Sequence, residues 1–135
     1  LLMALRKELN LSMLFISHDL SVVRYLSDQV VGMYLGKIME TARADDLFEH
    51  PLHPYTQILL QATPVIGDKT LQRSKGIQGE PPSPMHVPSG CRFHTRCPYA
   101  TAECEKTEPP ARDFGDGHCT ACWHPLQERS RILTA

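Results

Sequence analysis

The sequence predicts an α/β fold, followed by a proline-rich segment and a small irregular extension that is rich in cysteine. Amphipathic helix patterns and strand patterns alternate over residues 1–62, an unbroken apolar run leads from Met13 to Ile16, and all five cysteines lie in the last third of the chain. A continuous apolar run is typical of a parallel strand that is buried on both faces.

The chain opens with the pattern of an amphipathic helix. Leu1, Leu5 and Leu9 recur every four positions and therefore share one helical face. Asn10 is expected to end this helix. The buried strand then follows over residues 13–17, as part of a central parallel sheet.

His18 comes directly after this strand and is the first candidate functional residue. In open α/β sheets the binding crevice lies beyond the carboxyl ends of the strands, which is where His18 would sit. The local pattern equally allows a simpler interpretation, in which His18 and Asp19 begin a surface loop and Asp19 caps the next helix. The apolar face of that helix carries Val22, Val23 and Leu26.

The pattern after this helix predicts an antiparallel hairpin and two more helices. Residues 29–34 and 37–41 have strand character, and Leu35-Gly36-Lys37 predicts a tight turn between them. A short helix is expected over residues 44–49. Pro54 suits the first turn of a last helix, because its missing N–H is not needed there. Its expected apolar residues are Tyr55, Ile58, Leu59 and Ala62.

Composition excludes several classes of function. The 14 Lys and Arg residues nearly balance the 15 Asp and Glu residues, so no net field attracts nucleic acid or an anionic membrane. No apolar run approaches the roughly 20 residues of a membrane-spanning helix, and no secretory leader is present. The protein is expected to be cytosolic. Because it begins with Leu-Leu-Met inside a helical pattern, we expect it to be the C-terminal part of something larger.

Periodicity ends at Thr63, and residues 64–90 are expected to form a linker or a strap. Prolines are frequent there, with Gly-Glu-Pro-Pro-Ser-Pro at 79–84, which favours an extended chain. The sequence does not distinguish a solvated tether from a strap that packs along a neighbouring surface.

The cysteine-rich segment is too short to bury an ordinary core, so a covalent or metallic link is expected to hold it together. Thiols stay reduced in a cytosolic chain, which favours a metal or iron–sulfur site over disulfides. The spacing does not choose between zinc and iron–sulfur, and disulfides or uncoordinated thiols stay possible. The cysteines are Cys91, Cys97, Cys104, Cys119 and Cys122. His94, His118 and His124 are spare candidate ligands, each more typical of a hydrogen-bonding loop residue.

Four ordered motifs resemble the ATP-binding subunits of oligopeptide and dipeptide ABC transporters, over nearly the whole chain. They are Ile16-Ser17-His18-Asp19-Leu20 followed by Val22-Val23-Arg24; Tyr34-Leu35-Gly36-Lys37-Ile38-Met39-Glu40; Pro51-Leu52-His53-Pro54-Tyr55-Thr56; and Gly90-Cys91-Arg92-Phe93-His94-Thr95-Arg96-Cys97-Pro98, with trailing Cys104 and Ala121-Cys122-Trp123-His124. The resemblance lies in the family's C-terminal portion.

The resemblance implies that residues 1–63 are the C-terminal part of a P-loop NTPase domain of ABC type, in which His18 forms the switch loop that contacts the γ-phosphate of ATP. An imidazole there can donate a hydrogen bond to phosphate oxygens. The phosphate-cradling loop, the strand that ends in the magnesium-binding aspartate and catalytic glutamate, and the Leu-Ser-Gly-Gly signature are absent from the sequence. ATP with Mg²⁺ is therefore expected to bind only when the upstream core is supplied, and the isolated chain is expected to be inactive as an ATPase.

The resemblance also implies a peptide-transporter extension over residues 91–126, after the linker 64–90 and before a tail at 127–135. At least some family members carry an iron–sulfur cluster there, which implies Cys91, Cys97, Cys104 and Cys122 as ligands of a 4Fe-4S cluster, with Zn²⁺ as the alternative. Cys119 departs from the family pattern and competes for the fourth ligand position.

The expected function is to energise peptide import. The implied partners are a second ATP-binding subunit and membrane permeases, with no nucleic acid, and the implied location is the cytoplasmic face of the cell membrane, reached through the permeases. The alternative is a stand-alone or degenerate metal-binding module without transport activity. A P-loop encoded in frame upstream of Leu1 would support the peptide-importer function over the stand-alone metal-binding module.

Overall fold

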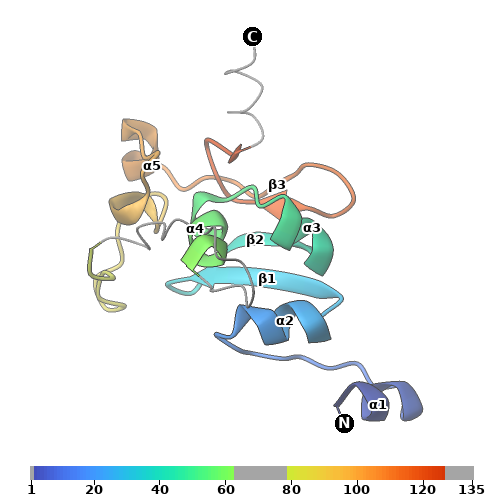
Figure 1. Ribbon diagram of the computed structural model, residues 1–135. Helices are drawn as coiled ribbons and strands as arrows, with labels where there is room; N and C mark the ends of the chain where they lie inside the picture. Colours follow the sequence, from blue (N-terminus) through green and yellow to red (C-terminus); the bar gives the residue numbers. More distant parts are fainter. Residues whose placement is uncertain (1, 63–78, 127–135) are drawn as a thin grey trace.

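The chain combines a small antiparallel sheet with short helices in the computed structural model, which describes residues 2–62 and 79–126. The sheet has four strands in the order β1-β2-β4-β3 (Figure 1). The strands are β1 Gln29–Tyr34, β2 Lys37–Arg43, β3 Arg112–Asp113 and β4 Cys119–Thr120. The expected linker residues 64–78 and the tail 127–135 lie outside the described residues.

The helices of the first half follow the sequence prediction closely. They are α1 Leu2–Glu8, α2 Leu20–Leu26, α3 Ala44–Glu49 and α4 Pro54–Ala62. Asn10 has a left-handed backbone, with φ of 51°, and ends the first helical segment as predicted. Asp19 caps α2 by accepting hydrogen bonds from the backbone N–H groups of Ser21 and Val22.

The predicted strand over residues 13–17 is wrong for this chain. Residues 11–17 form no strand and cross from α1 to α2 as an irregular segment (Figure 1). The side chains of Leu14 and Ile16 are 93% and 90% exposed. A parallel strand needs lateral neighbours to pair its backbone groups, and every strand pair among the described residues is antiparallel.

The predicted hairpin is confirmed as β1 and β2. Leu35 and Gly36 connect the strands with φ values of 46° and 76°, which is the pair of left-handed residues that a two-residue type I′ turn requires. The register pairs Tyr34 with Lys37 and shifts between Gly32 and Met33.

The cysteine-rich extension is built onto this hairpin. It contains a 3-10 turn η1 His94–Arg96, the helix α5 Ala102–Lys106, and the strands β3 and β4. β4 pairs with β2 so that Thr120 lies opposite Glu40 and Cys119 opposite Thr41. The sequence predicts an irregular extension, and these two short strands are an addition to that prediction.

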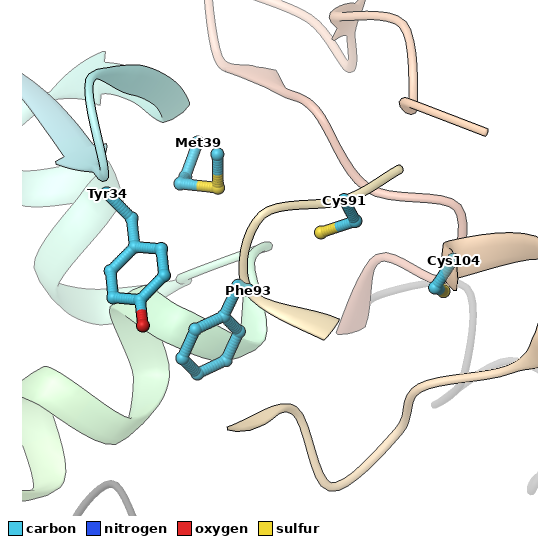
Figure 2. Packing of buried hydrophobic residues seen from close by; sticks show 5 residues of the cluster. All are labelled: Tyr34, Met39, Cys91, Phe93 and Cys104. Carbon is cyan, nitrogen blue, oxygen red and sulfur yellow. The ribbon is translucent and has the colours of Figure 1, made fainter. Parts of the chain in front are cut away.

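One buried cluster joins the hairpin to the extension. Tyr34 and Met39 from the hairpin pack with Cys91, Phe93 and Cys104 from the extension (Figure 2). The Phe93 ring is fully buried and meets the Tyr34 ring edge-on, with centroids 5.3 Å apart. The two parts therefore share a core. None of the described helices is long and apolar enough to cross a membrane.

Candidate functional site

Four cysteines of the extension line one cavity. These are the residues that the family resemblance implies as ligands: Cys91, Cys97, Cys104 and Cys122. The enclosed space has a volume of about 10 Å³, and its remaining walls are His53, Pro54, His94, Tyr99, Trp123 and His124. Cys119 does not line it, because β4 holds Cys119 opposite Thr41. The fifth cysteine is thereby set apart from the other four.

Backbone hydrogen bonds hold the four cysteines in place. The Cys91 N–H donates to the Cys104 carbonyl at 2.8 Å, which fixes the start of the extension against α5. The Cys97 N–H donates to the His94 carbonyl at 3.2 Å and closes η1. Cys122 follows β4, where the Ala121 N–H donates to the Met39 carbonyl at 2.9 Å. The hairpin therefore helps to place the last thiol.

Burial favours the protonated form of two of these thiols in the absence of a cation. It raises the pKa of Cys91 and raises the pKa of Cys122 to about 12, and the neighbouring thiols oppose ionisation of Cys122 further. A bound cation reverses this balance, because a coordinating thiol loses its proton. The cavity thus disfavours isolated thiolates and suits thiolates that are neutralised by a metal.

The cavity fits a thiolate-coordinated metal or cluster in the kind and number of its ligands. Four sulfur ligands are typical of structural zinc sites and of iron–sulfur clusters. All five cysteines are free thiols. Across residues 2–62 and 79–126, however, no three His, Cys, Asp or Glu side chains are arranged closely enough to hold a metal ion. The four cysteines line a shared space without the arrangement of a coordination shell.

The three histidines of the extension make hydrogen bonds, which is the role that the sequence analysis favoured over metal ligation. His94 Nδ1 lies 2.8 Å from the Cys91 carbonyl oxygen, and His124 Nε2 lies 2.9 Å from the Thr101 hydroxyl. His118 contacts the buried Glu40. His94 and His124 line the cavity with their rings partly engaged elsewhere.

Glu40 is a buried junction that the sequence analysis missed. Its carboxylate is fully buried and accepts from the Leu52 N–H at 2.6 Å, the His53 N–H at 3.0 Å and His118 Nε2 at 2.7 Å. It therefore connects β2, the start of α4 and the loop before β4. The only available signal was a charged residue that follows Ile38 and Met39 in a strand.

His53 lies between this junction and the cavity. Its Nδ1 accepts the Tyr55 N–H at 3.0 Å and so caps α4. Burial lowers the pKa of His53 to about 4, against a smaller raising effect of the Ala121 carbonyl. His53 is therefore neutral near pH 7, with its proton on Nε2.

His18, the predicted phosphate-contacting residue, lies apart from the cysteine cavity. Its side chain is exposed at the end of the irregular segment, directly before the Asp19 cap of α2. Asp19 has the capping role that the sequence predicted for it, and its N–H donates to the Ser17 hydroxyl at 3.0 Å. The phosphate-contacting role of His18 stays a prediction.

Known proteins resemble this chain over most of its length. The family model described as "Oligopeptide/dipeptide transporter, C-terminal region" matches residues 39–104. The di/tripeptide transport ATP-binding protein DppF of Pseudomonas aeruginosa is 47% identical over 127 residues, which are 94% of this chain and 39% of the relative. The oligopeptide transport ATP-binding protein OppF of Escherichia coli is 51% identical over 112 residues, 81% of this chain and 33% of the relative. AppF of Bacillus subtilis is 48% identical over 120 residues, 87% of this chain and 36% of the relative.

All three relatives are named as ATP-binding proteins of transport systems. Within that class, the chain belongs to the oligopeptide/dipeptide ABC transporter family, and it carries that family's C-terminal region. It spans less than two fifths of the length of these curated relatives.

Proposed function

We propose that this chain is the C-terminal part of an ATP-binding subunit that energises the import of peptides by an ABC transporter. The identity of 47% to a di/tripeptide transport ATP-binding protein, over 94% of the chain, carries this proposal. The names of the OppF and AppF relatives point to the same class of substrate.

The exposed apolar residues of the N-terminal segment support the proposal that a nucleotide-binding core covers this segment in the complete subunit. Leu14 and Ile16 expose 93% and 90% of their side chains, and no residue of α1 is buried. Contiguous apolar exposure of this kind marks a contact surface. In the proposal, residues 13–17 become a strand of a parallel sheet whose other strands are supplied by upstream sequence.

In that setting His18 is the residue that senses the terminal phosphate. It follows the proposed strand directly, so its imidazole would stand at the carboxyl end of the sheet and donate a hydrogen bond to the γ-phosphate. Asp19 holds the backbone after it by capping α2. Magnesium and the phosphate cradle require residues that this sequence does not contain.

The partners follow from the proposed class. They are a second ATP-binding subunit and membrane permeases, without nucleic acid, and the subunit would lie on the cytoplasmic side of the membrane by contact with the permeases. Peptides would be bound by other components of the importer.

We further propose that Cys91, Cys97, Cys104 and Cys122 bind an iron–sulfur cluster of the 4Fe-4S type, with Zn²⁺ as the alternative. Their convergence on one cavity supports this assignment, and the separate position of Cys119 supports leaving it out of the ligand set. The lining side chains would have to rearrange around the bound group, since the described side chains have no ready coordination geometry. Metal binding would add folding free energy to a segment with little core of its own.

ATP hydrolysis by the subunit with its complete nucleotide-binding core tests the role of His18. We expect His18→Ala to lower the turnover on the order of 100-fold, as loss of one preorganised donor to a reacting phosphate does. His86→Ala is the matched control, because His86 is also exposed and lies in the segment before the extension. Equal turnover of His18→Ala and His86→Ala would reject the proposed role.

Elemental analysis of the anaerobically purified subunit tests the metal assignment. Iron and sulfide with visible charge-transfer absorption would support the cluster, and stoichiometric zinc without colour would favour the alternative. Absence of both would reject a metal site at these cysteines.

A further inference from the structure

Thr101 occupies a helix-capping position without making the capping bond. It is the N-cap residue of α5, with φ of −121° and ψ of 171°, yet its side chain makes no cap hydrogen bond. A threonine there ordinarily accepts a hydrogen bond from a backbone N–H of the first turn, and this bond stabilises the helix. The hydroxyl is directed to other partners.

Those partners are a cavity thiol and an imidazole. Thr101 Oγ1 lies 3.5 Å from Cys104 Sγ and 2.9 Å from His124 Nε2. His124 also serves a second thiol, because its backbone N–H donates to Cys122 Sγ at 3.4 Å. Residues 101 and 124 therefore connect two sulfurs that come from separate parts of the extension.

A hydroxyl has one proton, so this chain of contacts has a direction. If Cys104 is a thiol, its S–H can donate to Thr101 Oγ1, and the hydroxyl can donate to His124 Nε2. If Cys104 is a metal-bound thiolate, it can only accept, so the Thr101 hydroxyl must donate to sulfur. The oxygen is then free to accept from His124 Nε2–H.

We propose that Thr101 is a positioning residue that donates a hydrogen bond to Cys104 Sγ when the cavity holds a metal, with His124 Nε2–H orienting the Thr101 hydroxyl. This inference rests on the proposed metal site. It adds two residues that act on a ligand without binding the metal. Such hydrogen bonds to ligands commonly change metal affinity about 10- to 100-fold.

Zinc affinity of the complete, metal-depleted subunit tests the proposal, measured by competition with a chromophoric chelator. Thr101→Val removes the hydroxyl and keeps the shape, and we expect it to weaken zinc binding by about 10-fold or more. Thr101→Ser keeps the hydroxyl and is expected to stay close to the parent protein. Thr107→Val is the matched control, because Thr107 is the exposed C-cap residue of the same helix.

A double-mutant cycle provides a readout that general loosening of the extension would not reproduce. His124→Phe removes the donor that orients Thr101, so it should weaken zinc binding too. The double variant Thr101→Val with His124→Phe should be little weaker than the Thr101→Val variant alone, because both changes break one chain of hydrogen bonds. The thiolate-to-cobalt charge-transfer band of the Co²⁺-loaded protein should shift in Thr101→Val and not in Thr107→Val.

The outcomes separate this inference from the metal assignment. Zinc binding by the parent protein with equal affinity in Thr101→Val would overturn the role of Thr101 and leave the metal site standing. Additive losses in the double variant would also overturn it. If the parent protein holds neither an iron–sulfur cluster nor zinc or cobalt at these cysteines, the proposed metal site fails, and the role of Thr101 fails with it.

Discussion

The buried carboxylate of Glu40 is expected to be the main anchor between the hairpin and the extension. Its two oxygens accept from three donors at 2.6, 3.0 and 2.7 Å. Glu40→Gln leaves one carbonyl oxygen and turns an NH₂ group toward at least one of these donors. Hydrogen bonds to a charged group contribute about 1.5–3 kcal/mol each, so losing one and weakening the others costs about 3 kcal/mol.

Hydrogen exchange of the Leu52 and His53 amides in the complete subunit measures this cost, because both donate directly to Glu40. A loss of about 3 kcal/mol corresponds to exchange on the order of 100-fold faster. Glu108→Gln is the matched control, since Glu108 also joins the extension to the hairpin through Lys37, at 2.6 Å, but at an exposed position. Exchange rates in Glu40→Gln within a factor of three of those in Glu108→Gln would refute the reasoning.

Three further predictions concern the cavity, the buried histidine and the activity of the chain. Gly90→Ala should abolish metal binding, because Gly90 has φ of 65° and an added Cβ would meet the Cys104 carbonyl and lie 2.8 Å from Glu105 backbone atoms. Gly79→Ala is the control, because Gly79 has a similar φ of 79° but open space around it, and this variant should bind metal normally. Competition with a chelator measures both affinities. Because the pKa of His53 falls from 6.5 to about 4 on folding, the unfolded state binds the proton more readily below pH 6.5. The free energy of unfolding should therefore have its full value above pH 6.5 and fall by up to about 3 kcal/mol toward pH 4. In His53→Asn, which keeps a capping acceptor, this pH-dependent part of the free energy should be absent when urea denaturation is measured at a series of pH values. The isolated 135-residue chain should show no ATPase activity above background in a phosphate-release assay. Sustained turnover would contradict the proposal that the phosphate cradle and the magnesium ligands come from upstream sequence.

Local patterns predicted the elements whose cause is local. Asp19 caps α2, and Leu35-Gly36 makes the hairpin turn, because each feature depends on residues adjacent in the sequence. Pro54 begins α4 for the same reason. The convergence of four cysteines could also be predicted, although only the resemblance to a family separated them from Cys119.

Features that depend on distant partners could not be predicted in this way. The burial of Glu40 needs His118, which lies 78 positions later in the chain. The pairing of β4 with β2 involves only two residues of each strand and leaves no periodic signal. The apolar run at residues 13–17 led instead to the prediction of a strand that the structure does not contain. Its apolar character indicates a buried strand, but the partners of such a strand are absent from the described residues.

Hydrogen exchange across residues 14–17 tests the central claim most directly, by comparing the isolated chain with the same residues in the complete subunit. The account predicts fast exchange in the isolated chain, where these residues form no strand. In the complete subunit it predicts slowing by about 10³-fold or more, because strands in a packed core open only rarely. Slow exchange in the isolated monomer, or equally fast exchange in both proteins, would contradict the claim that this segment completes a nucleotide-binding sheet.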